Sequence, residues 1–222
     1  MFRNYLTVAL RNMVRHKLYS TINIAGLAVG LACVLFIVLF VRDELSYDQW
    51  LPGSEHLYRV EQTVLVPGRP VLPMAVIPFA MPKAMMDEIP EVTGMTRVWQ
   101  EEFTLTAGDK QFVETTVDVV DPGFFEIIKL HLIAGDPQQV LHEPGSIVLS
   151  QSASRKYFGS ADPLGKIITT GRGGCDDNDR ACLDSIISLK VTGVVRDIPH
   201  NSQLSGEFFV SNDSLADRYQ QR

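Results

Sequence analysis

Residues 22–41 read INIAGLAVGLACVLFIVLFV, a run of twenty residues in which no side chain carries a charge. As an α-helix this run would be about 30 Å long, which matches the hydrocarbon thickness of a bilayer. Gly26 and Gly30 would weaken a helix in water, but glycine is frequent in transmembrane helices. The run therefore predicts a transmembrane helix, which we place at residues 21–42, with Ser20 as a candidate N-cap.

The length of this run separates a membrane span from the alternatives. A cleavable signal peptide has an apolar core of about 7 to 15 residues, followed by small residues before the cut. Here apolar residues continue through 34–41, beyond Gly30-Leu31-Ala32-Cys33, the segment most similar to a lipoprotein processing site. A buried helix of a soluble protein rarely has so long an apolar run. We therefore interpret the segment as an uncleaved span, in which Cys33 is a small packing residue.

The charges around the run predict its orientation. The first 42 residues contain no acidic side chain, and their basic residues are Arg3, Arg11, Arg15 and Lys17 before the run and Arg42 after it. The rest of the chain holds 15 basic against 26 acidic side chains. Lys and Arg beside a membrane helix stay on the cytoplasmic side. We therefore expect a cytoplasmic N-terminus and residues 43–222 on the outer side, which in a bacterial inner membrane is the periplasm.

Residues 1–20 have the pattern of a second, different helix. Apolar residues recur at three- and four-residue spacing, at Phe2, Tyr5, Leu6, Ala9, Leu10, Met13 and Val14. Arginines and small polar residues occupy much of the remaining surface. Such a basic amphipathic helix is typical of one that lies in the membrane interface, with its cations toward anionic headgroups of the lipid bilayer. Alternatively, the arginines only fix the topology of the span.

The region from residue 43 onward has the alternating pattern of an α+β domain. Strands are expected at 57–64, 92–99, 102–106, 111–120, 146–149, 166–170, 186–195 and 208–210. Helices are expected at 79–88, 121–128 and 151–158, with a helical stretch after Asn212 and a proline-rich loop at 67–78. Asp121 is a candidate cap for the 121–128 helix and Ser150 for the 151–158 helix, and Gly159 is expected to end the latter. The turn at 107–110 predicts a hairpin of 102–106 and 111–120, but the pattern does not specify the rest of the sheet topology.

Two cysteines share one glycine-rich loop of the outer region. Cys175 and Cys182 lie in the loop 171–182, and an external compartment is oxidising. We favour a disulfide between them over two free thiols. Because the closed loop is short, the bond would rigidify the tip of the loop more than it stabilises the domain.

The sequence contains no familiar catalytic, metal or nucleotide motif. The acidic cluster 176–179 lacks the ligand spacing of a calcium loop, and the glycines at 171–174 lack the Lys-Ser/Thr of a phosphate-binding loop. The five histidines are scattered, and the carboxylate pair Asp43-Glu44 has the pattern of a solvated helix end. The acidic composition argues against nucleic acid as a partner. We expect no catalytic residue, no cofactor and no metal.

Four blocks of sequence resemble, in order, the N-terminal part of the MacB/FtsX-like family of ABC transporter permeases. They are NYLTVALRNMVRHKLYSTINIAGL at 4–27; DELSYD at 43–48 with LYRV at 57–60; IVLS, KYFG and DPLGK within 147–166; and VTGVVRDIPHNS at 191–202. The resemblance covers nearly the whole chain. It implies one transmembrane helix followed by a MacB-type periplasmic core domain, incomplete in this chain.

The resemblance also implies a function and its partners. A cytoplasmic ABC ATPase subunit would hydrolyse ATP, and the permease would transmit the resulting movement to a periplasmic partner or substrate. Further partners would be the remaining permease spans or a second permease copy. Family members continue into at least three more spans, so we expect a permease fragment. The alternative is a single-span, membrane-tethered periplasmic binding or sensor module without transport activity.

Overall fold

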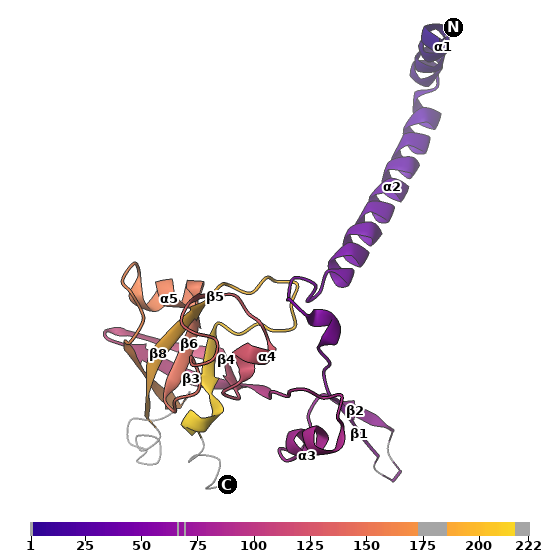
Figure 1. The fold of residues 1–222 in the computed structure, drawn as a ribbon. Helices are drawn as coiled ribbons and strands as arrows, with labels where there is room; N and C mark the ends of the chain where they lie inside the picture. The colour runs from indigo at the N-terminus through magenta and orange to yellow at the C-terminus, as the bar shows by residue number, and fades with distance from the viewer. Residues whose placement is uncertain (1, 66, 69, 173–185, 216–222) are drawn as a thin grey trace. The chain divides into compact units, whose positions relative to one another are not determined.

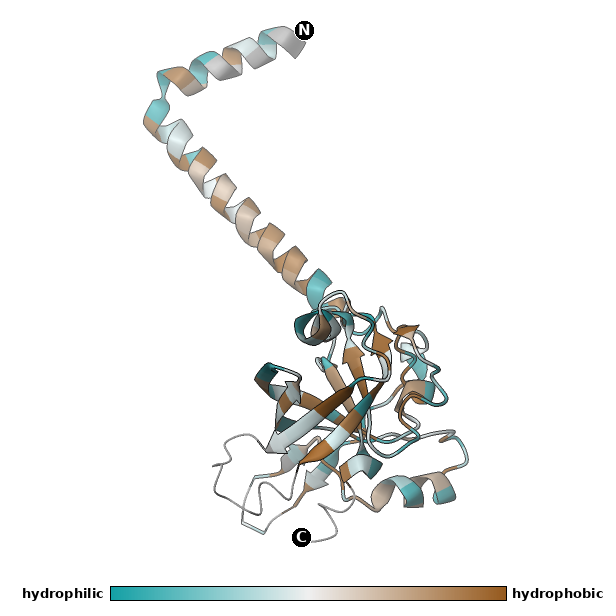
Figure 2. Ribbon diagram, turned by 90° about the vertical axis from the view of Figure 1, so that its left-hand side faces the viewer, coloured by the Kyte–Doolittle hydropathy of each residue, from teal (hydrophilic) through white to brown (hydrophobic). Residues whose placement is uncertain are grey.

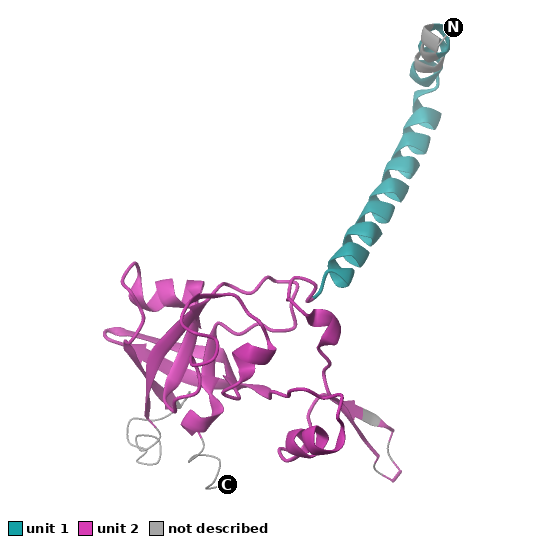
Figure 3. Ribbon diagram, viewed as in Figure 1, with its two compact units in different colours: residues 1–47 teal, residues 48–222 magenta. Residues whose placement is uncertain are grey.

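The computed structural model describes residues 2–65, 67–68, 70–172 and 186–215. It divides into two compact units, residues 1–47 and 48–222 (Figure 3). Cys175 and Cys182 lie outside the described residues, so their disulfide stays a prediction.

The first unit consists of two helices, α1 (Phe2–Arg15) and α2 (Lys17–Leu45). His16, with φ −113° and ψ 58°, leaves the helical conformation and separates them. The predicted cap at Ser20 is wrong, because α2 begins at Lys17 and Ser20 already donates its N–H to the carbonyl of His16. None of the residues of α2 is buried, and its apolar surface is visible in Figure 2. Among the described residues, α2 is the one helix long and apolar enough to cross a membrane.

The second unit is built on a ring of six strands (Figure 1). In ring order they are β8 (Ile187–Val195), β6 (Ser146–Ser150), β9 (Phe208–Ser211), β4 (Lys110–Val120), β3 (Val98–Ala107) and β7 (Ile167–Arg172). The ring closes because β7 pairs with both β3 and β8. The pairs β4–β9 and β6–β8 are parallel and the others antiparallel. The short β5 (Leu132–Ala134) pairs antiparallel with Val194 and Val195 at the C-terminal end of β8.

Alternate residues of the strands supply two apolar clusters. The first cluster is Phe103, Leu105, Ala107, Val117, Val119, Ile147, Leu149, Ala153, Tyr157, Ile168, Leu189, Val191, Phe208, Val210 and Leu215. The second is Leu51, Val120, Phe124, Phe125, Leu130, Val140, Leu141, Val148, Val195 and Phe209. In β9, Phe208 and Val210 belong to the first cluster and Phe209 to the second, as the period of two in a strand requires. The central strands β6 and β9 are therefore buried on both faces.

Three helical segments accompany the ring: α4 (Phe124–Ile127), α5 (Gln151–Phe158) and the 3-10 turn η2 (Asn212–Leu215). The predicted ends of α5 agree with the structure. The hydroxyl of Ser150 accepts the N–H of Ala153 at 3.0 Å, and Gly159 follows the helix at φ +65°. The beginning predicted for α4 is wrong: the helix starts at Phe124, because the carboxylate of Asp121 binds Arg97 instead of capping it.

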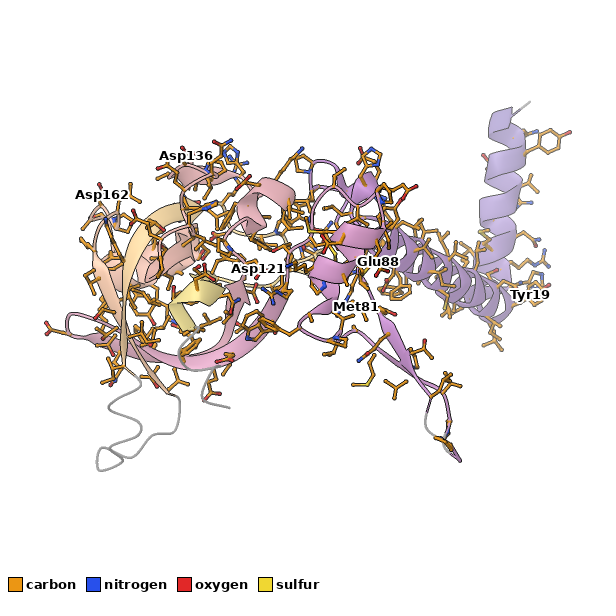
Figure 4. The ribbon with its side chains drawn as sticks, turned by 60° about the horizontal axis from the view of Figure 1, so that its bottom comes forward. Tyr19, Met81, Glu88, Asp121, Asp136 and Asp162 are labelled. Carbon is orange, nitrogen blue, oxygen red and sulfur yellow. The ribbon has the colours of Figure 1, made fainter. Side chains whose placement is uncertain are left out.

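Residues 52–97 form an extended arm without a buried residue among those described. It contains the 3-10 turn η1 (Ser54–His56), the hairpin of β1 (Gln62–Val64) and β2 (Leu72–Met74), and α3 (Met81–Glu88). At the end of the arm, Arg97 Nε lies 2.9 Å from Asp121 Oδ2, and its guanidinium lies 3.7 Å from the centre of the Phe79 ring. Figure 4 labels Asp121 and the two ends of α3.

Several predicted strands differ from the observed ones. The strand predicted at 57–64 is reduced to β1, and β2 lies inside the segment predicted as a proline-rich loop. Of the strand predicted at 92–99, only Val98 and Trp99 are in a strand. They belong to the same strand, β3, as the segment predicted at 102–106, and the register of β3 shifts between Glu101 and Phe103. The short strand β5 was not predicted.

Candidate functional site

The segment between β8 and β9, residues 196–207, forms hydrogen bonds with residues of the second unit that are distant in the sequence. We call it the coupling loop. At the beginning of the loop, the N–H of Arg196 donates to the carbonyl of His131 at 2.9 Å. It ends with the carbonyl of Glu207, which accepts the N–H of Ser150 at 2.7 Å. Both ends of the loop are therefore fixed to the framework of the ring.

The middle of the coupling loop forms hydrogen bonds with Asp48, the first residue of the second unit. Ser202 Oγ donates to Asp48 Oδ1 at 2.6 Å, and the N–H of Gln203 donates to the same oxygen at 3.1 Å. The N–H of Asp48 donates to the carbonyl of Asn201 at 3.0 Å. These three bonds join residues about 150 positions apart in the chain.

The backbone of Asp48 is unusual. Its φ is +56°, and among the described residues no other non-glycine has a positive φ. Aspartate tolerates this left-handed conformation better than most residues, because its short side chain can hydrogen-bond locally. Three residues later Leu51 is buried in the second apolar cluster, against which Ile198 and Leu204 of the loop also pack. Polar and apolar contacts thus hold the same short segment.

The beginning of the loop is bound to α5. Asp197 accepts the N–H of Ser152 at 2.8 Å and its hydroxyl at 2.7 Å. Partial burial raises the pKa of Asp197, but the hydrogen bonds from Ser152 and Ser150 and the charge of Arg155 outweigh it. The pKa is therefore held below its usual range. The carboxylate stays ionised at neutral pH, at the beginning of a helix, where a negative charge is favoured.

Two weaker contacts extend the network to other elements. Gln100 Nε2 on β3 donates to Ser205 Oγ at 3.2 Å, and Arg59 Nη1 lies 3.4 Å from Gln203 Oε1. Both are exposed, so we assign them little energy.

A small polar cavity of about 220 Å³ lies between the coupling loop and α5. Ser150, Ser152, Asp197, His200 and Ser202 are among the residues that line it. The Ser152 hydroxyl donates to a carboxylate, so it is not activated as a nucleophile by an imidazole. Within the described part of the chain, no group of three His, Cys, Asp or Glu side chains could hold a metal ion. The arrangement is suited to fixing chain segments to one another.

The sequence-predicted basic residues belong to the first unit. Arg11 and Arg15 are exposed on α1, and Lys17 is the exposed first residue of α2. The backbone of Arg3 is in α1, and its side chain is outside what the structure describes. Asp48 and Ser202 were not singled out from the sequence, although both lie inside blocks that resemble the permease family.

Comparison with known proteins identifies the domain. Residues 20–222 match the family model of the MacB-like periplasmic core domain. A domain of a permease protein from Porphyromonas gingivalis is similar at 25% identity and a TM-score of 0.50, over 64% of this chain and 55% of that one. This chain thus spans about half the length of that domain. No curated protein matches the chain.

Two further solved structures have weaker similarity. The periplasmic region of MacB from Actinobacillus actinomycetemcomitans is 20% identical, with a TM-score of 0.39 over 56% of this chain and 50% of that chain. The extracellular domain of the noncanonic ABC-type transporter YknZ from Gram-positive bacteria is 18% identical, with a TM-score of 0.44. The similarity covers 62% of this chain and 64% of that chain. The match of the family model over residues 20–222 is decisive. The chain belongs to the family of the MacB-like periplasmic core domain, as its resemblance to MacB/FtsX-like permeases predicted.

Proposed function

We propose that this chain is the membrane component of an ABC-type export or mechanotransmission system, and that it couples a cytoplasmic ATPase subunit to a periplasmic domain. The observation that carries the proposal is the set of bonds between Asp48 and the coupling loop. Only Ser46 and Tyr47 separate the end of α2 from Asp48. A displacement of the spanning helix would therefore reach the outer unit with little slack in the connecting chain.

The path of this movement follows the hydrogen bonds of the loop. From Asp48 it passes to Ser202 and Gln203, and from the ends of the loop to β6 and α5 through Ser150 and Ser152. Leu51 adds an apolar connection to the second cluster. Because β6 and β9 are buried on both faces and closely packed strands deform little, we expect the ring to move as a unit when Asp48 is displaced.

The proposal includes a topology. Residues 1–20 would lie on the cytoplasmic surface, 21–42 would span a bacterial inner membrane, and 43–222 would be periplasmic. The cations Arg11, Arg15 and Lys17 support this orientation. The partners would be the ATPase subunit, the remaining permease spans or a second permease copy, a periplasmic partner and the lipid bilayer. ATP hydrolysis would belong to the partner subunit.

Co-purification tests the proposed partnership. The protein, expressed with its natural reading frame and neighbouring genes, is extracted in mild detergent and captured through a tag. We expect an ATP-hydrolysing subunit with a phosphate-binding loop to co-purify, and the variant Asp48→Ala to retain it, because Asp48 is on the other side of the membrane. Reproducible absence of such a subunit contradicts the proposal.

A second candidate function is a membrane-tethered periplasmic binding or sensor module that works without an ATPase. The polar cavity beside the coupling loop favours it, since about 220 Å³ admits a few waters or a very small polar ligand. The same purification separates the two functions. A protein that repeatedly purifies without an ATPase, with its full reading frame present, supports the second.

A further inference from the structure

One ionisable group is buried under the coupling loop. Asp118 on β4 is only 1% exposed, and of the described residues none donates to either carboxylate oxygen with good hydrogen-bond geometry. Its pairing partners are Gln100 on β3 and Phe209 on β9. A buried carboxylate with so little hydrogen bonding is costly when ionised, and most of this cost disappears when it takes up a proton.

The coupling loop covers this carboxyl group with a glycine. A Cβ atom on Gly206 would lie 2.0 Å from Asp118 Oδ2, so any other residue there would have to displace the Asp118 side chain. Gly206 is itself buried. The backbone of the loop therefore lies directly against the carboxyl group, and opening the loop would expose this group to water.

The surroundings of Asp118 contain little charge to balance its own. It is met by the amide side chain of Gln100 from β3, by the backbone of Gly206 from the loop, and by Phe209 from β9. The nearest charged residues along these elements are Glu101 and Glu207, which are also acidic. Burial raises the pKa of Asp118 from 3.8 to about 6, although Gln100 and Gly206 lower it in part.

We propose that Asp118 is a proton-binding site that controls how firmly the coupling loop is held against the ring. With the proton bound, the neutral carboxyl group lies under Gly206 at little cost and the loop is closed. With the proton released, the buried charge favours an opened loop in which water reaches the carboxylate. As the same loop holds Asp48, protonation would regulate the coupling; this last step rests on the proposed function.

Hydrogen exchange of the intact chain in nanodiscs, without any ATPase, tests the site independently of the coupling. The closed loop binds the proton more tightly than the open one, so loop opening increases as the pH rises through about 6. If the open loop has the ordinary pKa of 3.8, the opening equilibrium of residues 196–207 rises about tenfold between pH 5 and pH 7.5, after correction for intrinsic exchange. Asp118→Asn should keep the loop protected at both pH values. The matched control is Asp109→Asn, which removes an exposed carboxylate in the turn of the same hairpin and should behave as the wild type.

Two results overturn the inference: a wild-type loop with no pH response, or a response that persists in Asp118→Asn. Protection of residues 146–150 in β6 reports whether that variant is folded. A measurement on the unmodified protein does not depend on the variant. The carboxyl carbon of Asp118, followed by NMR, should titrate within about one unit of pH 6, and a midpoint near 3.8 overturns the proposal.

Discussion

Replacing Asp48 removes the hydrogen bonds between the first residue of the second unit and the coupling loop. Asp48→Ala loses the bonds from Ser202 and from the N–H of Gln203. Hydrogen bonds to a charged group contribute about 1.5–3 kcal/mol each when buried. Asp48 is half-buried, so we take about 1 kcal/mol for each. Alanine at a φ of +56° adds about 1 kcal/mol of backbone strain, which gives a loss of about 3 kcal/mol.

Two other substitutions at this position separate the loss of hydrogen bonds from the backbone strain. Asp48→Gly adopts the left-handed backbone without strain, and we expect a loss of about 2 kcal/mol, from the hydrogen bonds alone. Asp48→Asn keeps an acceptor oxygen, and a loss of about 1 kcal/mol is expected. The predicted destabilisation therefore increases from Asn through Gly to Ala.

The assay is urea unfolding of the intact chain in detergent, followed by tryptophan fluorescence. Trp50 is two residues from the substitution and partly buried, so its emission should report release of the segment. Asp213→Ala, at an exposed aspartate of η2, is the matched control and should change the free energy of unfolding by less than about 0.5 kcal/mol. Equal effects of Gly and Ala, or no effect of Ala beyond the control, would refute the reasoning.

Three further predictions concern other parts of the second unit. Arg97→Met removes the ion pair with Asp121 and the contact over Phe79, so limited proteolysis should cut the arm 52–97 faster than in the wild type while the ring stays resistant. Ser150→Ala removes the cap of α5 and should lower the free energy of unfolding by about 1 kcal/mol, measured by urea titration. The raised pKa of Asp118 means that the folded state binds this proton more tightly than the unfolded state. Its contribution to stability is therefore present below pH 3.8 and is lost as the pH rises through about 6. Asp118→Asn should thus be more stable than the wild type at pH 7.5, by up to about 3 kcal/mol, with the difference vanishing below pH 4.

Features set by neighbouring residues could be predicted from the sequence. The helix α2 follows from the length of its apolar run, and α5 from its capping serine and terminal glycine. The hairpin of β3 and β4 follows from alternation around the Gly108-Asp109 turn. In each case the signal lies within the element itself, so periodicity and capping are sufficient.

Features that depend on distant pairing could not be predicted. Closure of the ring requires β7 to meet β3 and β8, and no local pattern specifies that register. The contact between Asp48 and Ser202 joins residues 154 positions apart, and each alone has the pattern of a solvated turn residue. Asp121 had the pattern of a helix cap, but the tertiary fold presents Arg97 to it. A charged partner in reach outweighs the capping preference.

The coupling claim is tested most directly by nucleotide-dependent hydrogen exchange in the assembled complex. The protein is reconstituted with its ATPase, and exchange of residues 196–207 is compared with and without ATP. Our account predicts that ATP changes the protection of this loop, and that Asp48→Ala abolishes the change while the ATPase stays bound and active. A loop that does not respond to ATP, or one that responds equally in Asp48→Ala, would contradict it.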